Sequence, residues 1–145
     1  MLVAFYKAKE GTLLAKLISL IDGSEHSHAV IVLDYNKNGL SLIKDCHVFY
    51  NGVSTRSVVL RKEDWDFINI PDPLVPDYQS KILINSNRKY GLLKTITTKI
   101  KWFPTFDKTT DTCSSWIARI SSFEDPNTYG LKKLYKKKKK LTAWQ

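Results

Sequence analysis

Apolar and polar positions divide the start of the chain into one segment of strand length and one of helical length. Residues 2–6 (LVAFY) form a short apolar run and predict a first strand. Residues 11–23 (GTLLAKLISLIDG) follow the spacing of an amphipathic helix, with Thr12 positioned as its N-cap and Gly23 as its C-terminal stop. The apolar stripe of this helix consists of Leu13, Leu14, Leu17, Leu20 and Ile21.

The next segments predict an antiparallel meander. Residues 28–35 (HAVIVLDY) are an almost uninterrupted apolar run, typical of a central strand that is covered on both faces. Asn and Gly tolerate a positive φ, so the sequences NKNG and NG mark turns. These turns lie at residues 36–39 and 51–52, and further strands are expected at residues 40–50, 54–60 and 67–70.

Three prolines in residues 71–77 end the strand region and predict a connector between the halves of one domain. Helical segments are expected at residues 77–88, 92–100 and 113–122, and a last amphipathic turn is expected around Leu131 and Leu134. This pattern predicts an α+β domain in which a small antiparallel sheet packs against helices.

The net charge of +9 is concentrated at one end of the chain. Seven lysines lie in the last fifteen residues and account for seven of the nine charges, so the rest of the chain carries only +2. We therefore expect a domain at residues 1–125 and a solvated, lysine-rich tail at residues 126–145. The lysines between Lys132 and Lys140 favour an anionic partner, either nucleic acid or a lipid surface, through weak contacts that salt screens.

The N-terminal residues do not have the pattern of a signal peptide, and no segment reaches the ~20 apolar residues of a membrane span. We expect a soluble cytoplasmic protein with free thiols, since two cysteines are no disulfide framework.

Cys113 stands where a loop is expected to give way to a helix, and the sequence also offers a base for its thiol. The positive end of a helix dipole favours a thiolate. His28 begins the predicted central strand, and Asp45 and His47 share one face of the neighbouring strand. A hairpin would bring His28 near Asp45 or His47, which gives the order nucleophile, base and orienting group.

Several of these residues also occur in motifs of a known family. Residues 5–36, with Ser27-His28-Ala29 at their centre, and the late Cys113-Ser114-Ser115 resemble circularly permuted papain-like cysteine hydrolases. These proteins form the permuted branch of the NlpC-type superfamily, which includes YiiX-like proteins and relatives of lecithin retinol acyltransferase. The resemblance spans roughly residues 2–120, and it includes the histidine-before-cysteine order that marks permutation. The segment 88–93 (RKYGLL) is similar to the Tyr-Gly segment before the cysteine helix.

The resemblance implies a permuted papain-like fold and a cysteine peptidase or amidase that needs no cofactor. Cys113 would be the nucleophile and His28 the base. Many relatives carry Glu or His as the third residue, and here Asp45 is the first choice and His47 the alternative. The backbone N–H of Cys113 and the hydroxyl of Tyr6 are the candidate oxyanion donors.

The remaining histidine and cysteine are not expected to take part in the chemistry. His26 is predicted to face solvent, and Cys46 to pack in the core. A zinc site formed by His26, His28, Cys46 and His47 is not expected, because Cys46 faces away from His47 and the usual ligand spacing is absent.

The substrate is the least determined feature. Tyr90, Trp102 and Phe103 are candidates to line the cleft. The threonines and lysines of residues 92–101 make a poor membrane face, so we expect an amide or peptide, from a cell wall or a host protein. The alternatives are a lipid acyltransferase or thioesterase on the same fold, and a non-catalytic binding module with a basic tail.

Overall fold

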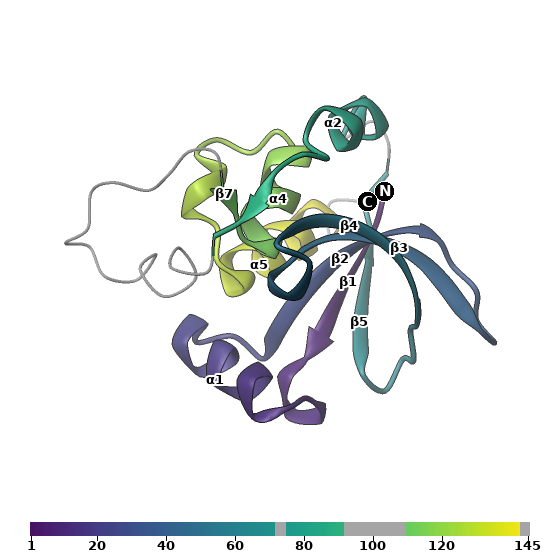
Figure 1. Ribbon diagram of the computed structural model, residues 1–145, viewed down its shortest axis with the longest axis vertical. Coiled ribbons are helices and arrows are strands. Elements are labelled where there is room, and N and C mark those ends of the chain that lie inside the picture. The colour runs from purple at the N-terminus through teal and green to yellow at the C-terminus, as the bar shows by residue number, and fades with distance from the viewer. Residues whose placement is uncertain (72–74, 92–109, 143–145) are drawn as a thin grey trace.

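The computed structural model describes residues 1–71, 75–91 and 110–142. Within these ranges the chain is a mixed α+β protein with a five-stranded antiparallel sheet and four α-helices (Figure 1). The sheet strands are β1 (Leu2–Lys7), β2 (His26–Asp34), β3 (Leu40–His47), β4 (Gly52–Val59) and β5 (Trp65–Asn69). The helices are α1 (Leu13–Asp22), α2 (Tyr78–Ile84), α4 (Cys113–Ile120) and α5 (Leu131–Thr142). A parallel pair of short strands is formed by β6 (Lys89–Tyr90) and β7 (Thr110–Asp111).

The strand order is β4-β3-β2-β1-β5, so β2 lies at the centre of the sheet, as its apolar run predicts. The other expected strands are confirmed within a few residues of their bounds. β5 pairs with β1 and completes the sheet on the side opposite β4. The predicted helix at 92–100 lies outside the described residues.

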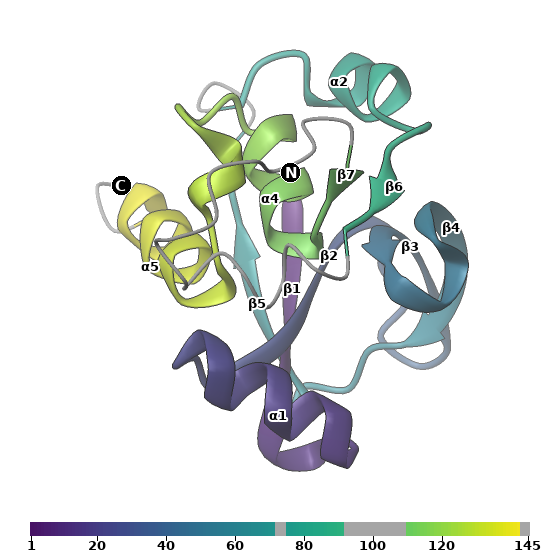
Figure 2. The same ribbon diagram turned by 60° about the vertical axis from the view of Figure 1, so that its left-hand side comes forward.

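One face of the sheet carries the main core, which α4 and α5 cover (Figure 2). Alternate residues of β1 and β2 contribute Val3, Phe5 and Ile31 to this core. Trp116 and Leu134 enter it from α4 and α5. Seven of the eight residues of α4 are buried, so this helix is held on nearly all sides.

A second, smaller cluster lies on the other face of the sheet. It contains Val30 and Ile43 of the central strands, and Val58 and Phe67 pack against it. Val58 belongs to one edge strand and Phe67 to the other, so the sheet curves until both edges contribute to one cluster.

Helix α1 has the predicted ends, but its apolar stripe faces away from the core. The Thr12 hydroxyl accepts a hydrogen bond from the Ala15 N–H, and Gly23 ends the helix in the left-handed conformation (φ 59°). The leucine stripe that would ordinarily enter the core is exposed instead, and no residue of α1 is fully buried.

The lysine-rich end of the chain also differs from the expected solvated tail. Residues 131–142 form α5, and Leu131, Leu134 and Lys138 are buried at helical spacing. Tyr135 packs on Phe5 with ring centroids 5.0 Å apart. Lysines occupy most of the other positions of α5 and conceal this stripe in the sequence. Over these residues the basic segment is part of the folded unit.

None of the described helices has the length and apolarity required to cross a membrane.

Candidate active site

Cys113 is the first residue of α4, and a capping box of two reciprocal hydrogen bonds closes the start of this helix. The Thr112 hydroxyl accepts from the Ser115 N–H (3.2 Å), and the Ser115 hydroxyl accepts from the Thr112 N–H (2.8 Å). Only 5% of Cys113 is exposed. The thiol therefore lies in a fixed position at the positive end of the helix.

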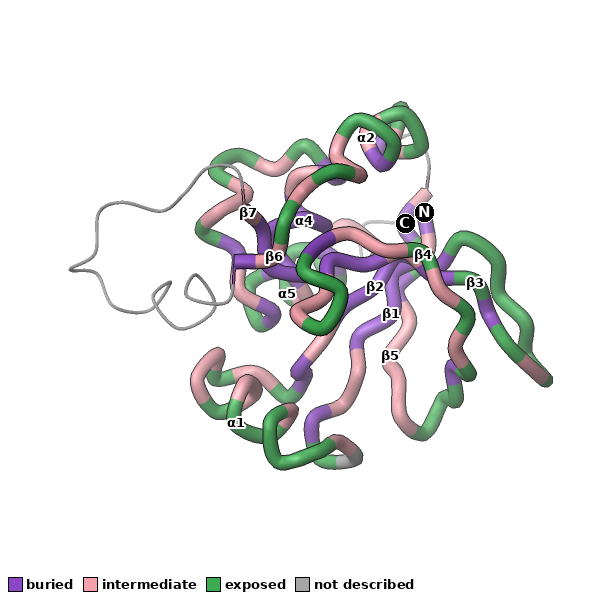
Figure 3. The backbone as a smooth tube through the Cα atoms, in the orientation of Figure 1, coloured by how far each residue is buried: buried purple, intermediate pink, exposed green. Residues whose placement is uncertain are grey.

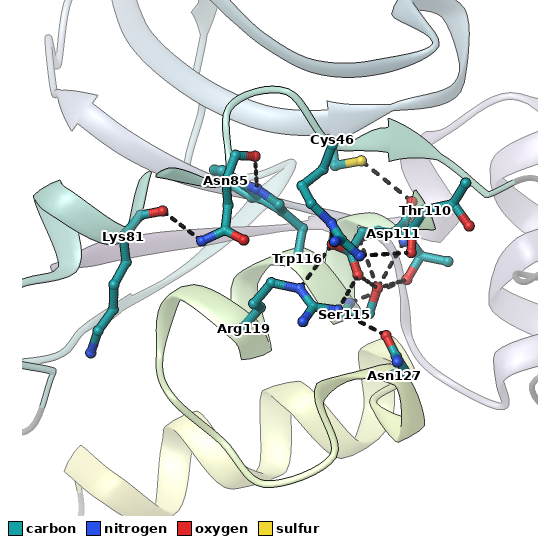
Figure 4. A network of polar contacts seen from close by, with 11 residues as sticks. Cys46, Lys81, Asn85, Thr110, Asp111, Ser115, Trp116, Arg119 and Asn127 are labelled. Carbon is teal, nitrogen blue, oxygen red and sulfur yellow. Dashed lines mark hydrogen bonds and ion pairs between the residues drawn. The ribbon is translucent and has the colours of Figure 1, made fainter. Parts of the chain in front are cut away.

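A buried carboxylate anchors the segment that leads into this helix (Figure 4). Asp111 is completely buried and forms ion pairs with Arg88 (2.6 Å to Nε) and with Arg119 (3.1 Å to Nε). The Ser115 hydroxyl donates to the other carboxylate oxygen at 2.9 Å. This network joins the residue before β6 to β7 and α4, and it fixes the backbone directly before Cys113.

His28 lies between the cysteine and a second buried carboxylate. Its Nε2 lies 2.6 Å from an Asp45 carboxylate oxygen. Because Nε2 is engaged in this way, Nδ1 is the ring nitrogen left to interact with the thiol of Cys113. Burial lowers the pKa of His28, but the negative charge of Cys113 and the hydrogen bonds to Asp45 and Cys113 outweigh it and raise the pKa to about 9. At neutral pH the His28 ring is therefore protonated.

Asp45 is held as an anion by three neighbours. In addition to His28, the Arg56 guanidinium donates to it at 2.6 Å, and the Ser54 hydroxyl donates at 3.4 Å. Burial raises the pKa of Asp45, but its hydrogen bonds to His28 and Arg56 lower it to about 2. The residue therefore remains charged throughout the physiological range, although its side chain has no exposed surface.

Arg56 is a site residue that the sequence did not reveal. It lies on β4, one strand beyond Asp45, and only the register of the two strands brings them together. An arginine in an edge strand most often faces solvent. A carboxylate that is completely buried needs a cation nearby, so the burial of Asp45 would have pointed to Arg56. This burial is known only from the structure and cannot be read from one sequence.

His47, the alternative third residue, lies beside His28 but does not bind it. The two ring centroids are 4.9 Å apart in an edge-to-face arrangement, and His47 Nδ1 accepts from the Phe49 N–H at 3.1 Å. Burial and the nearby charge of His28 lower the pKa of His47 to about 4. A neutral imidazole cannot balance the charge of an imidazolium, so the geometry favours Asp45 as the orienting group.

The predictions for Cys46 and His26 have different outcomes. Cys46 is completely buried, its thiol donates to the Asp111 carbonyl oxygen at 3.4 Å, and burial raises its pKa strongly. His26 was expected to face solvent, and this is wrong: it is only 2% exposed. Its Nε2 pairs with Asp66 at 2.8 Å, and Tyr135 of α5 covers its ring.

Of the residues weighed for a zinc site, His28 and His47 lie beside each other, whereas His26 pairs with Asp66 and the Cys46 thiol donates to the Asp111 carbonyl oxygen. A different group, His28, Asp45 and His47, has potential ligand atoms within 4.8 Å of one another in the described part of the chain. The Asp45 carboxylate in this group is already bound by His28 and by the Arg56 guanidinium. A cation at this place would have to displace both contacts, so the donor set does not fit a metal site.

Two hollows border the candidate site. A cavity of about 210 Å³ is lined by His28, Tyr6 and Arg56, and a smaller one of about 30 Å³ is lined by Cys113. Tyr90 lines both hollows. Tyr90 is therefore located where a cleft residue was expected, and Tyr6 faces His28 from the adjacent strand.

The Cys113 amide is among the N–H groups that a helix start leaves without an intrahelical partner. The other cleft candidates, Trp102 and Phe103, lie outside the described residues.

In comparisons with known proteins, no family model matches the chain, and neither a curated protein nor a solved structure matches it.

Proposed function

We propose that this protein is a cysteine hydrolase that cleaves an acyl compound through a covalent acyl-enzyme. The observation that carries the proposal is the chain of contacts from Cys113 to His28 to Asp45, with His28 charged beside the thiol. A helix start, a base and a buried orienting anion are the parts that activate a nucleophilic thiol.

The reaction follows from these contacts. The Cys113 thiolate attacks the substrate carbonyl carbon, forming a carbon–sulfur bond and a tetrahedral oxyanion. The N–H of Cys113 stabilises this oxyanion, and the Tyr6 hydroxyl is a further candidate donor. His28 gives its proton to the leaving group as the carbon–nitrogen or carbon–oxygen bond breaks. It then takes a proton from the water that hydrolyses the thioester, and the thiolate is restored.

Asp45 acts in this mechanism through its contact with His28. By accepting from Nε2 it fixes the ring so that Nδ1 points toward the thiol, and its charge stabilises the imidazolium. Arg56 keeps Asp45 ionised and is a positioning residue.

The α+β architecture, the order His28 before Cys113 and the motifs around both residues support a permuted papain-like fold for the chain. In such a fold the thiol comes from a helix and the histidine from the sheet, which is the arrangement of α4 and β2.

An amide or peptide is our first substrate class. A lipid ester or thioester is the second, favoured by the apolar residues at the mouth of the cavity beside His28. Leu14 and Phe49 line this cavity and expose 46% and 79% of their surface. An acyl chain would be accommodated there.

The test is to trap the covalent intermediate. The protein is incubated with peptidoglycan fragments, a peptide library and short-chain phospholipids, then quenched with acid and analysed by intact-protein mass spectrometry. We expect an acyl adduct on Cys113 and product release by the wild type, and neither by Cys113→Ala. The Cys46→Ala variant is the matched control and should behave as the wild type. Turnover that persists in Cys113→Ala would refute the proposal.

A further inference from the structure

Helix α1 presents an apolar surface where an amphipathic helix would ordinarily present a polar one. Its leucines are among the most exposed apolar side chains of the described residues. The exposed fractions are 85% for Leu13, 46% for Leu14, 50% for Leu17 and 78% for Leu20. We call these four residues the leucine face. Figure 3 shows α1 at the edge of the molecule, exposed or intermediate along its length.

The leucine face is a single stripe. Its members lie at positions i, i+1, i+4 and i+7, which cover about one third of a helix circumference. The opposite side of the helix carries Ala15 and Ile18, and Ile18 packs against the main core. The helix is thus attached to the body by its smaller apolar side, and the larger apolar side stays between 46% and 85% exposed in the described part of the structure.

Positive charge lies next to the leucine face. A cavity of about 790 Å³ at the C-terminal half of α1 is lined by Lys7, Lys9, Lys16 and Leu20. Its walls also include the acidic Glu25 and Asp66, and Asp66 is already paired with Lys7 at 3.3 Å.

A second cavity, of about 480 Å³, adjoins the first. Ser24 and Glu25 line both, and the second is lined further by Lys132, Lys136, Lys139 and Lys140 of α5. The N–H of Lys132 donates to the Asp22 carboxylate at 2.8 Å, which fixes the start of α5 at the end of α1. The leucine face and the α5 lysines therefore form one continuous surface.

We propose that this surface docks on an anionic phospholipid bilayer, with the leucine face in the headgroup region and the lysines on the lipid phosphates. An apolar stripe bordered by lysines is the pattern of a helix that lies in the membrane interface. Each lysine near an anionic surface strengthens binding by about fivefold.

The alternative occupants fit this surface less well. Nucleic acid would bind the lysines but leave the leucine face in water, because phosphates offer nothing to exposed leucine side chains. A second copy of the chain would cover the leucine face but bring like charges together, since both copies carry the same lysines at its border. A bilayer satisfies both halves of the surface.

Docking in this orientation also affects the candidate active site. Leu14, Ala15 and Ile18 of α1 line the cavity that contains His28, so its mouth would lie beside the bilayer. This consequence rests on the proposed function, whereas the docking itself does not depend on Cys113.

The test is co-sedimentation with vesicles, either of phosphatidylcholine alone or with 30% phosphatidylserine. We expect binding to the anionic vesicles, and the double variant Leu13→Asp/Leu20→Asp should bind at least tenfold more weakly. The matched control is Leu83→Asp/Ile84→Asp on α2, where the two side chains are 72% and 78% exposed at the other end of the molecule (Figure 1). The control should bind as the wild type.

Two further variants separate the contributions to binding. Lys132→Gln/Lys136→Gln/Lys139→Gln/Lys140→Gln should bind anionic vesicles at least tenfold more weakly in 0.1 M salt. Cys113→Ala should bind as the wild type, so failure of the hydrolase proposal would leave this result intact. Circular dichroism checks that each variant folds.

Three outcomes would overturn the docking proposal. The first is equal vesicle binding by the leucine variant and the α2 control. The second is the absence of vesicle binding together with a dimer that Leu13→Asp/Leu20→Asp dissociates, which would assign the leucine face to a second copy. The third is binding of duplex DNA, but not vesicles, through the lysines.

Discussion

Replacing Cys113 with alanine should lower the pKa of His28. In the wild type this pKa is raised from 6.5 to about 9, against the effect of burial, and the charge of Cys113 is the largest of the causes that raise it. Without the charge of Cys113, only Asp45 opposes the effect of burial, which lowers the pKa of His28. We expect a decrease of at least about one pKa unit, equivalent to about 1.4 kcal/mol of lost preference for the imidazolium.

The same shift makes the stability of the protein depend on pH. Because the folded-state pKa of His28 lies above the unfolded value, its contribution is fully present below pH 6.5 and is lost as the pH rises toward 9. A shift of this size corresponds to roughly 3 kcal/mol of unfolding free energy across the window. In Cys113→Ala the loss should be smaller and should occur at lower pH.

The assay is an NMR titration of the histidine ring nitrogens, with urea unfolding measured at each pH. The chain has three histidines, so single His→Gln variants assign the signals. Cys46→Ala is the control, since this thiol is neutral and buried, and it should leave His28 near 9. A wild-type His28 that titrates near 6.5, or equal values in Cys113→Ala and Cys46→Ala, would refute the charge interaction between Cys113 and His28 on which the proposed function depends.

Three other outcomes follow from buried groups and are measurable by urea unfolding. Asp45→Asn should lower the unfolding free energy by about 3 kcal/mol, because it leaves Arg56 and His28 without their anion. In the wild type, the contribution of Asp45 to stability should be lost as the pH falls from 3.8 to 2. An unchanged urea midpoint of Asp45→Asn at pH 7 would contradict this. Lys138 is completely buried, donates to the Ser121 hydroxyl, and has its pKa lowered by burial to about 7. Its contribution to stability should therefore rise between pH 7 and 10.5, and Lys138→Met should be more stable than the wild type at pH 6 by about 2 kcal/mol. A less stable Lys138→Met variant would show that the ammonium is needed. Leu134→Ala should lower the unfolding free energy by about 3 kcal/mol, whereas Lys136→Ala, at an exposed position, should change it by less than about 0.5 kcal/mol. Equal effects of the two substitutions would mean that α5 does not pack on the core.

Local signals in the sequence were sufficient for the sheet and for the helix starts. The apolar run at 28–35 predicted the central strand, Thr12 predicted the N-cap of α1, and the change from loop to helix at Cys113 predicted the start of α4. These signals depend on neighbours along the chain, so a single sequence contains them. The pairing of His28 with Asp45 was also within reach, because one hairpin joins their strands.

The remaining features depend on contacts between distant segments. Periodicity identifies the apolar stripe of α1 but not the side on which the body lies, so its exposure could not be read from the sequence. The burial of His26 depends on Tyr135, which is more than a hundred residues away. The ion pairs of Asp111 with Arg88 and Arg119, likewise, are visible only once the segments before and within α4 are in place.

The most direct test of the central claim is the labelling of the two cysteines by iodoacetamide at pH 6, followed by peptide mass spectrometry. An ordinary thiol, with a pKa of roughly 8.5, is almost entirely protonated at this pH and reacts slowly. We expect Cys113 to be labelled in the folded protein and Cys46 to remain unmodified. His28→Ala should slow the labelling of Cys113 at least tenfold, Asp45→Asn should slow it less, and His47→Gln should change it little. Faster labelling of Cys46, or labelling of Cys113 only in denaturant, would show that Cys113 is not an activated nucleophile.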